Sequence, residues 1–207
     1  SEMCIRDSLI SILLGLSMGS GTVFSLQYGA GRMKALRRSI YVSAVLIGTV
    51  TIVLNIAALS FIHPILKLLQ IPDDIYQMMY DYLWIIFWGI GFTFIYNFYA
   101  ALLRAIGNAV TPLYFLAISV VLNIGLDLFF ILLLDWGIKG AAIATIIAQG
   151  VSALGIMGYT YAKCPELRLH RNDLHFDRHC LKEITSFSTL TCIQPVSYTH
   201  LTLPTKL

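Results

Sequence analysis

The residue best placed to do chemistry is Asp127, which lies in the segment VVLNIGLDLFF. Asn123 precedes it by four residues and Ser119 by eight, so in a helix the three side chains share one face. Thr145 and Gln149 have the same four-residue spacing in the next apolar segment. The oxygen atoms of Asp127, Asn123 and Thr145 are hard ligands, which suit Na⁺ or a proton with water better than a transition metal. We therefore hypothesise a cation site between these two segments.

Five apolar segments must position these side chains. Each is 22 or 23 residues long and, apart from Asp127, none contains Asp, Glu, Lys, Arg or His. A helix needs about 20 apolar residues to cross a bilayer. Only 12% of the residues are charged, against about 25% in a typical soluble domain. We predict an all-α, polytopic membrane protein with five transmembrane helices, at about residues 9–30, 40–62, 82–103, 113–134 and 140–162.

Asp127 lies at hydrocarbon depth in the fourth of these segments. The midpoint of the segment is near Asn123, which places Asp127 about 6 Å from the midplane. A charge at this depth costs at least about 2.5 kcal/mol, so we expect the carboxylate to face the bundle or a wet cavity. It is then either neutral, because burial disfavours the ionised form, or ionised against a cation. The structural alternative is a protonated carboxyl that is hydrogen-bonded to Asn123 and holds two helices together.

Other polar and aromatic side chains in the segments are candidates for the wall of a cavity. The third segment is rich in aromatic residues, and its central members could contact flat, apolar ligands. Packing alone is the other interpretation of each of them, and the residues near the segment ends fit an interfacial aromatic belt. The candidate cavity-lining residues are Ser119, Gln149, Asn97, Tyr96 and Trp88.

The loops between the segments alternate in charge. Ten Lys and Arg residues lie in the loops on one side, at residues 31–38, at residue 104 and at residues 163–182. The opposite loops contain only Lys67 and Lys139. The positive-inside rule places the basic loops in the cytoplasm and the protein in the plasma (inner) membrane, where these loops meet anionic lipid. Acidic residues such as Asp81 are then expected as solvated charges at the outer face.

Several stretches outside the segments carry no predicted chemistry. Residues 1–8 and 195–207 fit no neighbouring pattern, and we expect them to be non-native tails. Residues 163–182 are interpreted as a solvated linker, and residues 183–194 as the start of a further helix. The cysteines and histidines of the linker match no standard zinc spacing, so no metal site is predicted there.

The same sequence features exclude other classes of protein. The segments contain no second ionisable group that could assist Asp127 as a general acid or base, so we predict no enzyme and no cofactor. No glycine-rich phosphate loop or nucleic-acid motif is present in the sequence.

Residues 101–149 resemble the multidrug and toxic compound extrusion family, the MATE transporters. The resemblance rests on four features in order, and the segment SLQYGAGRMKALRR supports it; in all it covers about residues 9–193. The four features are an Arg-Ala-x-Gly turn at Arg104–Gly107, Thr111–Pro112, Asn123–Asp127 and Gly137–Ala142.

The resemblance implies a fold of twelve transmembrane helices in two lobes of six. The five predicted spans would be helices two to six of the N-terminal lobe. Residues 163–182 would be the cytoplasmic linker between lobes, and residues 183–194 would start helix seven. Helix one and the C-terminal lobe would be missing partners from the same protein.

The resemblance also implies an activity, the efflux of amphipathic or cationic organic compounds by an antiporter driven by H⁺ or Na⁺. In some members the ion site of the N-terminal lobe uses an Asp and an Asn on helix five and a Thr on helix six. Asp127, Asn123 and Thr145 occupy the matching positions. The alternative within the same superfamily is a flippase for lipid-linked oligosaccharide or lipid II. Such flippases tend to place cationic residues in the central cavity, and the absence of Lys and Arg from the five segments favours the antiporter.

Overall fold

The computed structural model describes residues 2–68, 73–167 and 181–187, except for the side chains of residues 2–14, 65, 67–68 and 73–74. The described part contains helices and turns and no strand, which confirms the all-α prediction. Residues 181–187 are helical as well. The other elements are α1 (Glu2–Gly29), α2 (Met33–Ser60), α3 (Ile62–Leu68), α4 (Asp73–Trp88), α5 (Ile90–Ala105), α6 (Val110–Leu128), a π-helix η1 (Phe129–Leu133), α7 (Gly137–Lys163) and a 3₁₀-helix η2 (Pro165–Leu167).

Four helical segments of the described part are long and apolar enough to cross a membrane, by length and composition. They are Met33–Ser60, Ile75–Ala105, Val110–Leu133 and Gly137–Lys163. They correspond to the second, third, fourth and fifth predicted spans. The first predicted span, 9–30, overlaps α1 (Glu2–Gly29), which is not among the four.

The structure describes only part of the chain outside the predicted spans. Residues 2–8, expected as a non-native tail, continue α1 without a break. The tail at 195–207 and most of the 163–182 linker lie outside the described residues. Of the further helix expected at 183–194, residues 183–187 are described and are helical. The origin of the tails and the role of the linker therefore stay predictions.

The third predicted span is two helices, because the chain breaks at Gly89 between α4 and α5. In an unbroken helix the carbonyl of Phe87 would accept a hydrogen bond from the amide of Gly91. Here the side chain of Asn55, on α2, donates to this carbonyl at 2.5 Å. Irregular backbone at membrane depth is tolerated where neighbouring side chains satisfy it. Asn55 supplies that partner.

At the predicted outer end, the structure changes the interpretation of Asp81. We expected a solvated loop charge, but α4 begins at Asp73, so Asp81 lies in its third turn. Its carboxylate forms an ion pair of 2.6 Å with Lys139 at the start of α7. Exposed pairs of this kind contribute little to stability, because solvent screens them. The pair links α4 to the start of α7.

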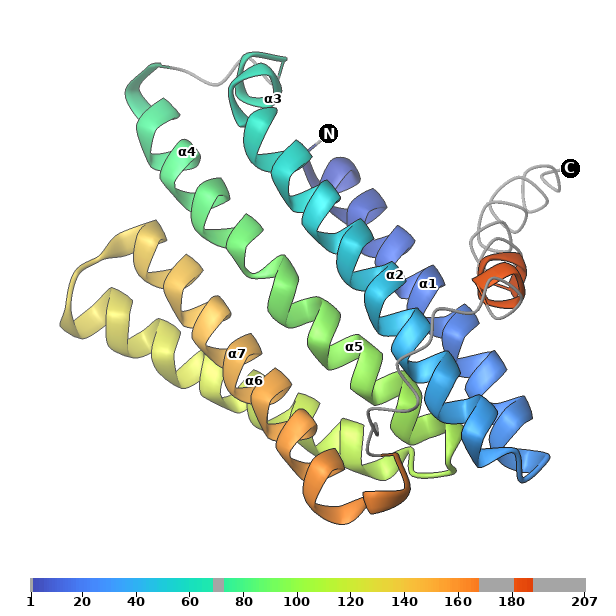
Figure 1. The fold of residues 1–207 in the computed structure, drawn as a ribbon. Coiled ribbons are helices and arrows are strands. Elements are labelled where there is room, and N and C mark those ends of the chain that lie inside the picture. Colours follow the sequence, from blue (N-terminus) through green and yellow to red (C-terminus); the bar gives the residue numbers. More distant parts are fainter. Residues whose placement is uncertain (1, 69–72, 168–180, 188–207) are drawn as a thin grey trace, which may run out of the picture.

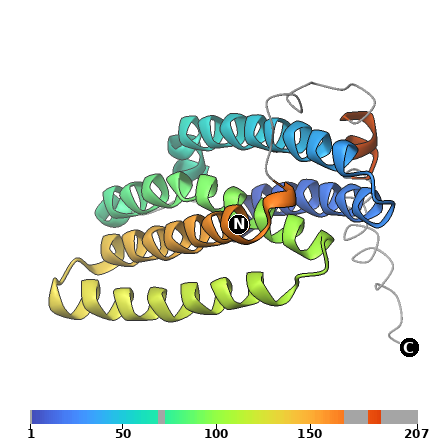
Figure 2. The same ribbon diagram turned by 60° about the horizontal axis from the view of Figure 1, so that its bottom comes forward.

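The helices pack in layers, which Figure 2 shows with α2 on one side and α6 on the other. Between them α1 lies against α2 and α5, and α7 lies against α4, α5 and α6. In Figure 1 the two halves of the broken helix run through the middle of the bundle, with α4 above α5. The break at Gly89 therefore lies inside the bundle, beside α7.

The main apolar cluster is centred on α1, α2 and α5, with further members from α3, α4 and η2. Phe24, Leu36, Ile47 and Leu102 are all at most 1% exposed and belong to one cluster with Phe98. Phe98 packs edge-on against Phe24, with ring centroids 6.2 Å apart. By contrast, Pro112 is the one buried residue of α6. The helix that carries Asp127 is therefore packed mainly on a single face, toward α7.

Candidate ion site and cavities

Polar side chains join α6 to α7 along the face that contains Asn123. Ser119 donates a hydrogen bond to the carbonyl of Ala148, at 3.1 Å. One turn further along, Nδ2 of Asn123 lies 3.3 Å from Oγ1 of Thr145. The Thr145 hydroxyl in turn donates to the carbonyl of Ala141, at 2.9 Å. The structure thus brings together Asn123 and Thr145, two of the three side chains that the spacing grouped.

Asp127 lies one helical turn beyond Asn123, next to this pair. Because α6 and α7 are antiparallel, the same register places Asp127 opposite Gly140 and Ala141 of α7. Its Oδ1 atom is buried and has no hydrogen-bond partner among the described residues. Buried polar atoms in folded proteins nearly always have a partner, so an orphaned carboxylate oxygen is the position where a proton or a cation would bind.

The backbone becomes irregular directly after Asp127. The α-helical hydrogen-bond pattern ends at Leu128 and gives way to the π-helix η1. Isolated π-helical turns occur frequently at functional sites, because the wider turn displaces the side chains before it. The chain then reverses through Asp135 and Gly137, which have φ of 52° and 53°. The carboxylate therefore lies just before an irregular end of its helix.

Four of the five candidate cavity residues line one cavity of about 380 Å³ between α5, α6 and α7. They are Tyr96, Asn97, Ser119 and Gln149. The Tyr96 hydroxyl donates to the carbonyl of Pro112 at 2.8 Å, which fixes the aromatic ring in the wall. Trp88 does not line this cavity: it is 57% exposed and packs beside Trp84, at a centroid distance of 5.9 Å.

The same cavity has polar lining residues that the sequence analysis missed. Thr93 and Ser152 contribute hydroxyl groups, and Arg104 contributes a cation. Ser152 donates to the carbonyl of Phe115 at 2.9 Å, which is a further bond between α7 and α6. The spacing of Thr93 and Asn97, four apart in the third segment, was the signal that could have found this face.

Arg104 corrects one premise of the sequence analysis. We placed it in a loop, but it belongs to the last turn of α5. It lines the 380 Å³ cavity and also a second one of about 570 Å³, between α1 and α5. The transmembrane bundle therefore does present a basic side chain to its cavities. The absence of Lys and Arg from the segments no longer argues against a flippase.

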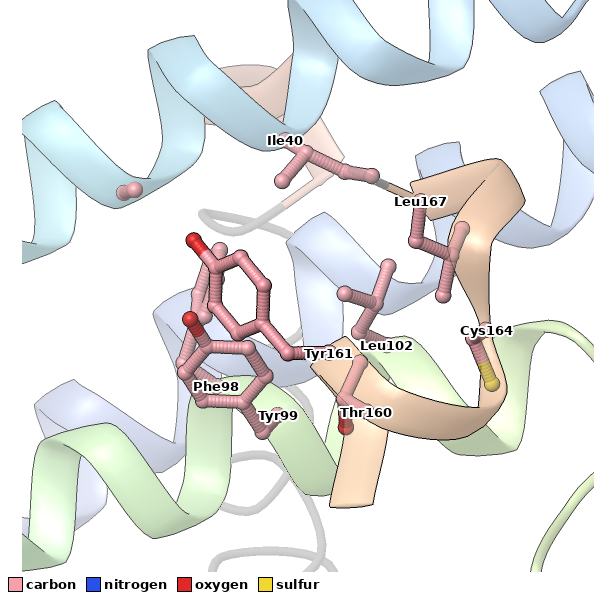
Figure 3. A pocket seen from close by; sticks show the side chains of 9 residues that line it. Ile40, Phe98, Tyr99, Leu102, Thr160, Tyr161, Cys164 and Leu167 are labelled. Atoms are coloured by element: carbon pink, nitrogen blue, oxygen red, sulfur yellow. The ribbon is translucent and has the colours of Figure 1, made fainter. Parts of the chain in front are cut away.

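A third cavity, near the inner end of the bundle, is small and mostly apolar. It holds about 60 Å³ between α2, α5, α7 and η2. Figure 3 shows the rings of Phe98, Tyr99 and Tyr161 on one side of it and Leu167 and Cys164 on the other. Burial, and then the charge of Glu166, raise the pKa of the Cys164 thiol. A protonated, half-buried thiol of this kind reacts slowly, so we interpret this cavity as a packing feature.

The fold and the site define a class before any comparison: a polytopic helical membrane protein with cavities and a buried carboxylate. The model of the MatE family matches residues 3–129, and the chain belongs to this family. The match begins inside the stretch that we expected as an N-terminal tail.

Curated relatives carry the names of multidrug resistance proteins. "Probable multidrug resistance protein YpnP" from Bacillus subtilis is 37% identical over 147 residues, which are 71% of this chain and 33% of the relative. "Probable multidrug resistance protein YoeA" from the same organism is 30% identical over 174 residues, 82% of this chain and 36% of the relative. The chain therefore spans about a third of the length of these relatives.

A solved structure described as MATE in the bent conformation has a similar fold. It matches with a TM-score of 0.86 and 21% identity, over 93% of this chain and 43% of the solved chain. This agreement confirms that the chain has the MATE transporter fold, over less than half of a solved transporter.

Proposed function

We propose that this chain is part of a secondary active efflux antiporter for amphipathic or cationic organic compounds, driven by H⁺ or Na⁺. Its five spans would be helices two to six of the N-terminal lobe, and the basic loops would face the cytoplasm. The names of the curated relatives support multidrug efflux as the activity. The observation that carries the ion-coupling role is the buried, unpartnered Oδ1 of Asp127 beside the Asn123–Thr145 pair.

The physical role of Asp127 follows from the two states of its carboxyl group. A neutral carboxyl tolerates a dry, collapsed surrounding, whereas an ionised one requires water or a cation. Binding of the coupling ion therefore favours one conformation of the lobe over another, by as much as the ion's affinities for the two differ. Asn123 and Thr145 would supply further oxygen ligands to Na⁺, or hydrogen bonds to water when the coupling ion is a proton.

Arg104 supports a second candidate, a flippase for lipid-linked oligosaccharide or lipid II. Its guanidinium on the wall of two cavities could bind a pyrophosphate group through paired hydrogen bonds. The antiporter remains the better supported proposal, because the flippase offers no role for the orphaned carboxylate at membrane depth.

The test is Asp127→Asn in the whole transporter, reconstituted in vesicles with an imposed pH or Na⁺ gradient. The amide has nearly the shape of the carboxyl but cannot take up a proton or balance a cation. We expect gradient-driven export of a cationic dye to fall at least about tenfold, since lost stabilisation of one buried charge exceeds 1.4 kcal/mol.

Asp135→Asn is the matched control for this experiment. Asp135 is exposed and has a left-handed backbone, which asparagine also adopts, so we expect parental export. Export and ion coupling that both survive in Asp127→Asn would refute the coupling role. If vesicles of the parent move a lipid pyrophosphate but no dye, the flippase is the correct function.

A further inference from the structure

Two cavities meet at Thr93 and Gln149. The 380 Å³ cavity reaches Arg104 and Ser119, and a cavity of about 240 Å³ reaches Thr145 of the candidate ion site. Thr93 and Gln149 are the two residues that line both cavities. These two side chains therefore lie at the boundary between the two cavities.

The first of these cavities continues toward the end of α5 that carries Arg104. It shares Asn97 and Arg104 with the 570 Å³ cavity, which extends along α1 to Thr22 and Ser25. The three cavities thus form a series with polar groups in each. Each of these cavities has room for several water molecules and offers them polar partners, which are the conditions under which a cavity holds water. The series leads from the predicted cytoplasmic end of the bundle to Thr145.

The contact between the two shared residues is a single weak hydrogen bond. Oγ1 of Thr93 lies 3.3 Å from Oε1 of Gln149, across the interface of α5 and α7. The same hydroxyl lies 3.3 Å from the carbonyl oxygen of Gly89 on its own chain segment. A hydroxyl group has one proton to donate, and both distances are long for a hydrogen bond between oxygens. Rotation of this hydroxyl therefore exchanges the cross-helix bond for a local one at little net cost.

The break in the third span holds Gln149 in this position. A Cβ atom at Gly89 would lie 3.1 Å from Oε1 of Gln149 and 3.0 Å from the carbonyl oxygen of Ile86. Any larger residue at this position would press on the amide and on the backbone. The glycine between α4 and α5 thus allows the Gln149 side chain to approach the backbone and reach Thr93.

We propose that Thr93 and Gln149 form a gate between the Arg104 cavities and the cavity at Thr145. With their hydrogen bond closed, water and the coupling ion are kept from Thr145, the member of the candidate ion site that lines the inner cavity. With it open, the cavities join and the ion site exchanges with the predicted cytoplasm. The role of this gate in ion coupling rests on the proposed function, but the existence of the gate does not depend on Asp127.

Thiol labelling of a cysteine placed behind the gate tests it. Ile86 is half-buried and lines the inner cavity without touching the other two, so Ile86→Cys reports access to that cavity. The host is the whole transporter with its native cysteines replaced by serine. A small cationic methanethiosulfonate is applied to the side of the membrane that carries Arg104. Ser25→Cys, in the 570 Å³ cavity, is the control for access to the passage in front of the gate.

We expect slow labelling of Ile86→Cys in the parent and fast labelling of Ser25→Cys. Gln149→Ala removes the amide, and Thr93→Val keeps the volume of the side chain but removes the hydroxyl. Each should raise the labelling rate of Ile86→Cys by roughly two- to threefold, the effect of losing one neutral hydrogen bond at the weak end of the usual range. Neither should change the rate at Ser25→Cys.

Two results would overturn the gate. Equal rates at Ile86→Cys in the parent and both variants would show that the pair controls no access. Faster labelling in Gln149→Ala but not in Thr93→Val would show that the bulk of the Gln149 side chain, and not the hydrogen bond, blocks access. These outcomes are separate from the Asp127→Asn export assay, so the gate and the coupling role can fail independently.

Discussion

The α1–α2–α5 packing and the α6–α7 pair are built in different ways. The former is an apolar core in which large side chains such as Phe24, Leu36 and Leu102 are fully enclosed. The latter is joined by hydrogen bonds from Ser119, Asn123 and Ser152, while α6 has a single buried residue.

Within a membrane this difference has a physical consequence. Lipid is as apolar as leucine, so helices associate through close packing and hydrogen bonds, without a hydrophobic driving force. The enclosed side chains of the core lose many van der Waals contacts when they are truncated, whereas each hydrogen bond contributes little. The comparison therefore teaches that α6, the helix that carries Asp127, is more loosely held than the α1–α2–α5 core.

The largest effect is expected where the core is truncated. Leu102 is 1% exposed in the core, whereas Leu113 on α6 is 64% exposed. We expect Leu102→Ala to lower the free energy of unfolding of the transporter by about 2–5 kcal/mol, and Leu113→Ala to change it little. Reversible unfolding in mixed detergent micelles measures both. Equal losses in the two variants would break the comparison.

A smaller effect is expected at Gly140, where the start of α7 packs closely against the chain segment that follows Asp127. A Cβ atom at Gly140 would lie 2.9 Å from Cβ of Phe130 and 3.1 Å from Cβ of Trp136, whose rings stack at 5.2 Å. Gly140→Ala should therefore cost about 1–3 kcal/mol in the same unfolding assay.

Gly158→Ala is the control on the same helix, since nothing lies within 4 Å of its Cβ position. It should be neutral or stabilising, because alanine favours the helix by about 0.5–1 kcal/mol. A stable Gly140→Ala protein would show that this end of the α6–α7 pair adjusts freely.

The smallest effect is expected from one hydrogen bond between α6 and α7. Ser152→Ala removes the bond to the Phe115 carbonyl and should cost about 0.6 kcal/mol, the average for such bonds within membranes. Ser60→Ala is the control, because the exposed Ser60 hydroxyl donates to the carbonyl of Ile56 on its own helix. A loss above about 2 kcal/mol for Ser152→Ala would contradict the view that this pair is loosely held.

The sequence predicted the helical class and the approximate positions of the spans, because apolar segments of bilayer length have few alternative structures. It also grouped Asn123 with Thr145 correctly in space, since four-residue spacings on two adjacent antiparallel helices bring such faces together. It did not predict the break at Gly89, because the partner that stabilises the break, Asn55, is distant in the chain. Arg104 was misplaced in a loop for a related reason. Hydropathy shows where a run of uncharged residues ends, but it does not show where the helix ends.

By itself, therefore, the sequence determined that this is a polytopic helical membrane protein, and it predicted that Asp127 lies at membrane depth. Hydropathy and charge are local properties, and local properties are enough for that conclusion. Only the tertiary structure decided that Asp127 Oδ1 has no hydrogen-bond partner among the described residues, that Arg104 lines two cavities, and that Thr93 and Gln149 line two neighbouring cavities. Each of these features depends on which faces of α5, α6 and α7 pack against one another. That packing joins residues far apart in the chain, so local sequence properties do not reveal it.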